Sequence, residues 1–297
     1  MPPPRRRLGF SLDRSIHLWL LLPAGLLFLA LTVFPLLYNV YISFHHFHFI
    51  RRIFNFVGAR NYLRLLQDGL FLASIGNTLK FVALATAAEV LLGTGLALLF
   101  NARLRGRQIL LPLAILPMML PTMVVCAVWV MGYDFEIGFL NSVLRALGLT
   151  SVLWLSDPRL ALPSIVLVDV WQWTPFVLLL ILAGLQSIPD HLYEAAQLDG
   201  AGGFKMFRYI TLPLLSFHVR LAVLLRVIDT FRIFDKVYAM TGGGPGYATE
   251  TISMYIYREG FRYFNLGYAG AASLVMVLLV LGASILYARR MWGELKA

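Results

Sequence analysis

Long apolar runs alternate with shorter polar segments along the whole chain. Six runs are long enough to be membrane-crossing helices: about residues 18–42, 74–100, 109–131, 160–185, 212–233 and 268–287. A helix rises about 1.5 Å per residue, so each run can cross a hydrocarbon core of roughly 30 Å. The pattern predicts an all-α, polytopic membrane protein. It has one transmembrane domain, 18–290, between a basic tail, 1–17, and a short tail, 291–297.

The first apolar run, 18–42, follows a basic cluster, as the apolar part of a secretory signal would. The cluster consists of Arg5, Arg6, Arg7 and Arg14. At roughly 25 residues the run is longer than that part of a signal peptide, and it lacks an obvious small-residue cleavage site. We therefore expect a retained spanning helix.

The charge distribution predicts which loops face the cytoplasm. Lys and Arg number 12 in the 54 residues of segments 1–16, 102–107, 187–209 and 289–297, and 9 in the 91 residues of the three other loops. Cytoplasmic loops carry the denser positive charge. Both termini and loop 187–209 are therefore expected in the cytoplasm.

Composition narrows the class of protein further. Hydrophobic residues make up 59% of the chain and charged residues 13%, and mean hydropathy is +0.76, which excludes an ordinary water-soluble domain. The net charge is +10, but the basic residues lie in short clusters beside apolar runs, so we expect no nucleic-acid partner. The single cysteine, Cys126, excludes an intrachain disulfide or a cysteine metal cluster.

Two short stretches could be mistaken for ligand sites. Segment 44–49 combines phenylalanine with His45, His46 and His48 at the end of the first run. No carboxylate or cysteine is near, so the segment is typical of the aromatic belt at a membrane surface, and we predict no metal site. The glycine-rich stretch 241–246 lacks the Gly-Lys-Ser/Thr ending of a phosphate-binding loop and predicts a sharp turn.

Prolines inside the predicted spans indicate helix breaks. They are Pro112, Pro117, Pro121 and Pro175. Each would kink its helix and free backbone carbonyls. Such a break is either buried in protein or lines a cavity, or else it is ordinary helix bending, and both interpretations stay open.

The segment 187–209, between the fourth and fifth runs, is polar in an otherwise apolar chain. Ser187 and Asp190 form a capping pattern, Ser-x-x-Asp, and good helix formers follow. The glycines that begin at Gly200 predict a turn into a second short helix, 204–209. Small side chains and carboxylates on such a knob suit the docking of a soluble partner.

This segment and the residues directly after it contain a specific pattern: Glu194-Ala195-Ala196, then Gly200, then, after nine residues, Ile210-Thr211-Leu212-Pro213. The pattern resembles the coupling motif of ABC-importer permeases. Three further stretches, 34–44, 138–141 and 234–245, look like those of the maltose-type carbohydrate importers. The resemblance covers about residues 18–290.

The resemblance implies the type I ABC importer permease fold, in a bacterial inner membrane. It implies a second, related permease, two ATP-binding subunits that hold ATP and Mg, and an extracytoplasmic solute-binding protein. It assigns the docking to an ATPase subunit to Glu194, Ala195, Ala196, Asp199 and Gly200. No Gly-x-x-x-x-Gly-Lys-Ser/Thr pattern occurs in the sequence, so we expect neither a cofactor nor enzyme activity in this chain.

Polar residues inside the fourth and fifth runs are candidates for the solute pathway, because such residues are costly in a membrane. Those in the fourth run lie at i, i+3, i+4 and i+7 of one helix face, and those in the fifth share a face. The resembling family builds its substrate site mainly from these two helices. We predict a transient sugar site lined by Asp169, Gln172, Trp173, Phe176, Arg226 and Thr230. The alternative, a buried ion pair of Asp169 with Arg226 or contacts to the partner permease, stays open.

The predicted function is ATP-driven import of a sugar or sugar derivative. Polyols, glycerol phosphate esters and sulfonated or phosphorylated sugars stay open, because Arg226 favours an anion whereas Asp169 and Asp229 can neutralise it. An ion-coupled secondary transporter would use Glu89 and these aspartates as proton relays, but the coupling motif and the lack of an internal repeat argue against it. Glu89 is expected to contact another helix. No Ser/His/Asp set or His-x-x-x-His pair at membrane depth supports a membrane enzyme.

Overall fold

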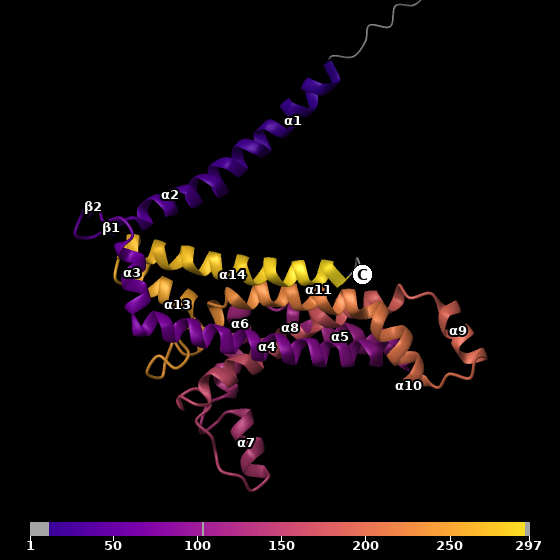
Figure 1. The fold of residues 1–297 in the computed structure, drawn as a ribbon. Helices are drawn as coiled ribbons and strands as arrows, with labels where there is room; N and C mark the ends of the chain where they lie inside the picture. Colours follow the sequence, from indigo (N-terminus) through magenta and orange to yellow (C-terminus); the bar gives the residue numbers. More distant parts are fainter. Residues whose placement is uncertain (1–11, 103, 295–297) are drawn as a thin grey trace, which may run out of the picture.

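The computed structural model describes residues 12–102 and 104–294. Residues 1–11 of the predicted basic tail and 295–297 of the predicted C-terminal tail lie outside the described residues. Helices dominate this part of the chain, and a single two-stranded hairpin accompanies them (Figure 1). The all-α prediction is confirmed.

Five segments in the described part are long and apolar enough to cross a membrane. They are Leu20–Ser43, Gly69–Asn101, Ala161–Gln186, Gly203–Phe231 and Leu266–Met291. The remaining predicted span, 109–131, is the third in chain order. It is a pair of helices, α5 (Arg107–Met119) and α6 (Thr122–Gly132), with a bend of 96° between them. Pro121 lies in extended backbone between them and has no N–H to continue the helix, which explains the break.

The first spanning segment diverges from the others. It consists of α1 (Leu12–Phe28), a π-helical turn (Leu29–Val33) and α2 (Phe34–Ser43), and Figure 1 shows it extending away from the bundle. Its end packs on the last helix, where the Asn39 amide donates to Ser273 Oγ at 2.8 Å. Ser273 belongs to the last helix, α14 (Leu266–Glu294).

The bundle is built around α8 (Ala161–Gln186), whose side chains are buried along most of its length. It packs most extensively against α4 (Gly69–Asn101), and both contact α11 (Leu212–Phe231). A Cβ added at Gly93 on α4 would lie 2.6 Å from Val177 Cβ on α8. Glycine thus permits the close helix approach that membrane bundles use for packing.

The fifth span begins earlier than predicted. Helix α10 (Gly203–Met206) and a π-helical turn (Phe207–Thr211) continue into α11, so a separate helix over 204–209 does not exist. Pro213 has no backbone N–H to donate to a preceding carbonyl. Just before it, the Leu212 N–H donates to Phe207 O across the π-helical turn, which is wider than an α-helical one. The chain thereby continues as a helix through the proline.

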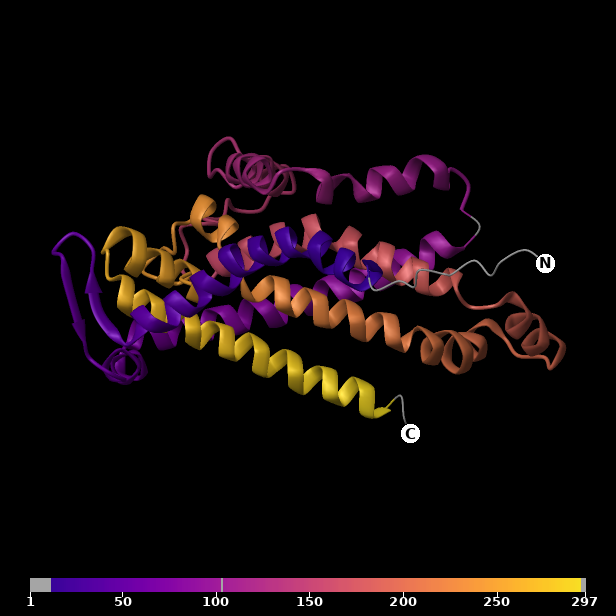
Figure 2. The same cartoon turned by 90° about the horizontal axis from the view of Figure 1, so that it is seen from above.

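Several short elements lie at the two ends of the bundle, and α7 projects from its side (Figures 1 and 2). Helix α9 lies at one end. The hairpin lies at the other, which we call the hairpin end, together with α3 and α13. The bounds of the short elements are α9 (Asp190–Leu198), β1 (His45–His48), β2 (Ile53–Phe56), α3 (Arg60–Gln67), α7 (Phe139–Ala146), α12 (Asp235–Met240), α13 (Ile252–Tyr257) and a π-helical turn (Arg258–Arg262).

Aromatic packing organises the hairpin. Strand β1 pairs with β2 in antiparallel register, with His45 opposite Phe56. The His45 ring stacks on Phe54 at a centroid distance of 4.5 Å, and its Nδ1 lies 2.8 Å from Tyr41 O. His45 is buried and His46 exposed, as alternation along a strand requires.

The glycine-rich stretch forms the predicted turn, and the loop after it is fixed by buried polar contacts. The Asn77 amide on α4 donates to Tyr247 O and Glu250 O. Glu250 is fully buried, and Arg258 Nη2 lies 2.8 Å from its carboxylate without the angles of a hydrogen bond. Burial raises the pKa of Glu250 to about 7, although the charge of Arg258 acts in the opposite direction.

Candidate functional site

Arg226, on α11, is the centre of a buried charged cluster between α4, α8 and α11. Its residue surface is 1% exposed. Nε and Nη2 donate to the two oxygens of Glu89 at 2.5 and 2.9 Å, in a forked pair. Nη2 also donates to Asp169 Oδ2 at 3.0 Å, and Nη1 to Asp229 Oδ2 at 2.7 Å. All three guanidinium nitrogens therefore donate to carboxylates.

Asp169 extends the cluster to α12. Its second oxygen, Oδ1, accepts from Lys236 Nζ at 2.6 Å, and both residues are buried. At the exposed side, Arg232 Nη2 donates to Asp229 Oδ1 at 2.8 Å. The ion pair of Asp169 with Arg226, left open by the sequence, is thus present within a larger network. Such a network is stable in a low dielectric only when its charges are paired.

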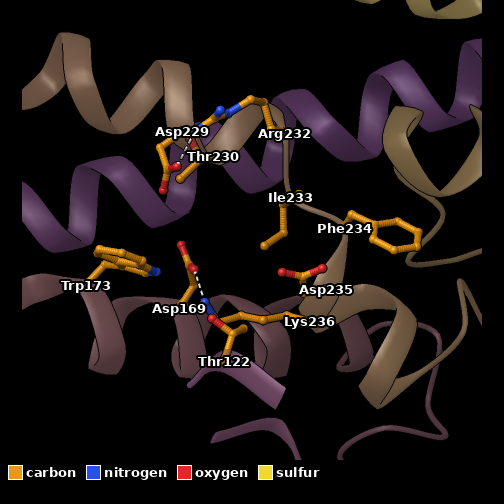
Figure 3. Close-up of a pocket in the computed structure, with 10 residues that line it drawn as sticks. All are labelled: Thr122, Asp169, Trp173, Asp229, Thr230, Arg232, Ile233, Phe234, Asp235 and Lys236. Carbon is orange, nitrogen blue, oxygen red and sulfur yellow. Dashed lines mark hydrogen bonds and ion pairs between the residues drawn. The ribbon is translucent and has the colours of Figure 1, made fainter. Parts of the chain in front are cut away.

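A cavity of about 310 Å³ lies beside the cluster. Figure 3 shows Trp173 and Asp169 on one side of it and Asp229 and Thr230 on the other. It is lined by Thr122, Asp169, Trp173, Asp229, Thr230, Arg232, Ile233, Phe234, Asp235 and Lys236. Hydroxyl, carboxylate and ammonium groups beside an indole ring can bind a polyhydroxyl molecule through hydrogen bonds and ring stacking.

A second cavity, of about 280 Å³, shares Trp173, Asp229 and Arg232 with the first. Phe176 and Arg226 contribute to its wall. The Trp173 ring centroid lies 5.2 Å from the Arg226 guanidinium carbon and 6.5 Å from the Phe176 ring. Five of the six predicted pathway residues therefore lie around these two cavities.

Gln172, the sixth, lies elsewhere. It is 1% exposed, and its Nε2 donates to Leu120 O at 3.2 Å, at the break between α5 and α6. It does not line either of the two cavities. Its amide instead satisfies a backbone carbonyl that the break leaves without a helical partner. The buried Gln172 side chain thus pairs with the carbonyl at the Pro121 break, although Pro121 itself is exposed.

The predicted docking segment is an exposed knob. One face of α9 is attached to the bundle, because Leu192 and Tyr193 pack on buried residues and Tyr193 Oη lies 2.9 Å from Thr211 Oγ1. Glu194 and Ala195 are exposed. Among the predicted docking residues, Asp199 and Gly200 are exposed and Ala196 is half-buried.

Two details of this segment concern its ends. The predicted cap at Ser187 is wrong, since its hydroxyl donates back to Gly184 O and α9 begins without a side-chain cap. Gly200 ends the helix as predicted, with a φ of +73° that disfavours any side chain. The apolar residues Leu198 and Phe204 are 90% and 80% exposed. Exposed apolar groups of this kind are typical of an interaction surface.

Comparison with known proteins connects these features. Residues 89–290, which contain the charged cluster and α9, match the model of a protein family described as binding-protein-dependent transport system inner membrane component. The chain belongs to this family. It is therefore a multi-pass permease of a binding-protein-dependent transport system, and the resemblance predicted from the sequence is confirmed.

Two relatives share most of the permease. The trehalose/maltose transport system permease protein MalF of Thermococcus litoralis is 41% identical over 271 residues, which cover 90% of each chain. The sulfoquinovosyl glycerol transport system permease protein SmoG of Agrobacterium fabrum is 35% identical over 278 residues, 93% of this chain and 90% of that relative.

The fold has a counterpart among solved structures. A chain in the crystal structure of a bacterial ABC transporter involved in the import of the acidic polysaccharide alginate matches with a TM-score of 0.85. The match covers 95% of the permease and 96% of that chain at 24% identity. The predicted ABC importer permease fold is thus confirmed.

Lys236 and Thr122 are site residues that the sequence did not predict. Lys236 lies after the fifth span, in a segment predicted to be an outer loop. It bonds to Asp169 because α12 packs beside α8. Thr122 lines the first cavity only because α6 starts at a sharp break. The one available sequence signal for Lys236 was its position directly after Phe234-Asp235, within the stretch 234–245 that resembles the carbohydrate importers.

Proposed function

We propose that the permease carries a neutral sugar across the inner membrane of a bacterium, by alternating access driven by ATP. In this proposal an extracytoplasmic solute-binding protein delivers the sugar, and a second, related permease completes the pathway. Two ATP-binding subunits hold ATP and Mg and carry out the hydrolysis. Both termini and α9 face the cytoplasm, and the hairpin end faces outward.

The full pairing of Arg226 is the observation that carries the neutral cargo. Its nitrogens already donate to Glu89, Asp169 and Asp229, so an anionic solute would have to displace one of these carboxylates. The side chain of Lys236 is likewise bonded to Asp169. An uncharged polyhydroxyl ligand avoids this cost and can use hydroxyl and carboxylate oxygens as they stand.

The two relatives differ in the charge of the solute in their names, and the one of higher identity supports a neutral cargo. The name of the relative at 41% identity gives trehalose and maltose, which are uncharged. The name of the relative at 35% identity gives a sulfonated glycoside, which is an anion. An anionic cargo is therefore the competing outcome of the test.

The segment 187–209 supports the proposed coupling. Glu194 and Ala195 on α9 are exposed, as are Asp199 and Gly200 directly after it, and small side chains there would let a partner approach the backbone. In this proposal Ala196 and these four residues dock on an ATP-binding subunit, and movement of α9 is transmitted to α11 through the continuous helix that starts at Gly203.

Two tryptophans on α8 provide a matched test of the sugar site. Trp173 lines both cavities, whereas Trp171 faces an apolar cavity beside α5 and α6. In proteoliposomes containing the whole importer and its binding protein, Trp173→Ala should lower uptake of labelled trehalose at least about tenfold. Trp171→Ala should lower it less than about threefold.

Two results would contradict the proposal. Equal uptake in the two tryptophan variants, with normal assembly, would remove the sugar from this site. Faster uptake of a sugar sulfonate than of trehalose by the unaltered importer would show that the cargo is anionic.

A further inference from the structure

Positive charge is concentrated at the hairpin end, where the positive-inside rule predicts little of it. Of the 9 Lys and Arg in the three predicted outer loops, four lie in loop 44–73. They are Arg51, Arg52, Arg60 and Arg64. The loop contains one carboxylate, Asp68.

Asp68 does not neutralise these arginines. Its Oδ1 accepts from the amides of Leu70 and Phe71, where it caps α4. Its Oδ2 accepts from the hydroxyls of Tyr255 and Tyr268 at 2.7 and 3.1 Å. Both oxygens are thus occupied, and within the described ranges none of the four arginines forms an ion pair with a carboxylate.

Two of these arginines face one cavity. It has a volume of about 350 Å³ and is lined by His46, Val57, Arg60, Asn61 and Arg64. Arg60 and Arg64 lie one helical turn apart on α3, so their guanidinium groups share a helix face. Forked donors at this spacing suit a tetrahedral oxyanion, which offers several acceptor oxygens.

The fold places this cavity between the ends of two spanning helices. Helix α2 ends at Ser43 and α4 begins at Gly69. The Asn61 amide donates to Ser43 O at 2.8 Å and to His45 O at 3.0 Å, which ties α3 to the end of the first span. The cavity therefore lies at the depth where lipid headgroups meet the protein.

Apolar side chains beside the cavity are exposed. Leu63 and Leu66, on α3, are 60% and 68% exposed, and Phe56 on β2 is 73% exposed. A short helix with basic and apolar faces is typical of a segment that lies in the membrane interface. A soluble oxyanion would leave these apolar groups in water, whereas a lipid would cover them.

We propose that this cavity binds the phosphate diester of an anionic phospholipid in the outer leaflet. Arg60 and Arg64 donate to the phosphate oxygens, and Leu63 and Leu66 contact the acyl chains. Lipid binding fixes α3 and, through Asn61, the junction of the first span with the hairpin. The site is independent of the sugar cavities and of the solute carried.

The test uses the whole importer in mild detergent, with phosphatidylglycerol as the probe and bound lipid counted by native mass spectrometry. The double variant Arg60→Gln/Arg64→Gln is compared with Arg51→Gln/Arg52→Gln, which removes the same charge from the hairpin loop outside the cavity. The cavity variant should weaken phosphatidylglycerol binding at least about tenfold more than the control variant. Phosphatidylcholine should bind weakly to all three proteins.

Four results would overturn the proposal. The first is equal phosphatidylglycerol binding by the two double variants. The second is equal binding of phosphatidylcholine and phosphatidylglycerol by the unaltered importer. The third is displacement of phosphatidylglycerol by inorganic phosphate at the same concentration as the lipid. The fourth is a cavity variant that keeps its lipid but loses affinity for the solute-binding protein, which would make the arginines a protein-docking surface.

Discussion

Replacement of Arg226 by methionine tests whether the charged cluster is a single unit. Methionine preserves the unbranched stem of arginine but lacks the guanidinium donors to Glu89, which is fully buried. Asp169 retains only Lys236. Breaking a buried pair from one side costs about 3–5 kcal/mol, because the remaining charge has lost its partner. For a chain of this size such a loss corresponds to roughly 10 °C in Tm.

A second substitution should reverse most of this loss. In the double variant Glu89→Gln/Arg226→Met, the buried unpaired charge is absent, so stability should recover by more than about 2 kcal/mol. Arg232→Met is the matched control. The side chain of Arg232 is 66% exposed and makes one ion pair, with Asp229, so its loss should cost less than about 1 kcal/mol.

Thermal unfolding of the purified permease can be followed through Cys126. This residue is the single cysteine in the chain and is 1% exposed, so a thiol-reactive dye labels it only as the bundle opens. An unchanged Tm for Arg226→Met would refute the reasoning. A double variant no more stable than the single variant would also refute it, since the cost would then not come from the unpaired carboxylate.

Two further predictions concern helix contact and pH. Gly93→Ala should destabilise the permease by about 1–3 kcal/mol because its Cβ would collide with Val177, whereas Gly95→Ala, with no atom within 4 Å, should be neutral or stabilising. Equal Tm values for the two variants would disprove the close contact. The pKa of Glu250 is about 7, above its ordinary value, so folding favours its protonated form and stability should fall by up to about 3 kcal/mol as pH rises from about 4.5 to 7. Glu250→Gln should remove this part of the pH dependence of Tm, and an unchanged pH profile would count against it.

The spanning helices could be predicted from sequence because hydrophobicity is a local property. The fourth run, expected at 160–185, is the helix Ala161–Gln186. The second begins at Gly69 instead of 74, because Asp68 caps it with two backbone hydrogen bonds. A polar cap is a weaker sequence signal than an apolar run, so helix starts are less predictable than helix cores.

The site was only partly predictable. The spacing of Asp169, Trp173 and Phe176 predicts one shared helix face, since that spacing is local, and in the structure Trp173 lines both cavities, Asp169 the first and Phe176 the second. Among partners distant in sequence, an Asp169–Arg226 pair was an open alternative, but two other contacts were not predicted. Glu89 meets Arg226 across 137 positions, and Gln172 bonds to Leu120 at a break of 96°. These contacts depend on tertiary packing, which hydropathy does not encode.

The coupling role of α9 is the central claim, and ATP-driven uptake by the reconstituted importer tests it most directly. Uptake and ATP hydrolysis are measured in the same proteoliposomes for the unaltered permease and for Glu194→Lys and Gly200→Asp. Both variants should insert into the membrane, but either ATPase binding or uptake per ATP hydrolysed should fall at least about tenfold. Uptake and ATP hydrolysis equal to those of the unaltered importer in both variants would contradict the claim.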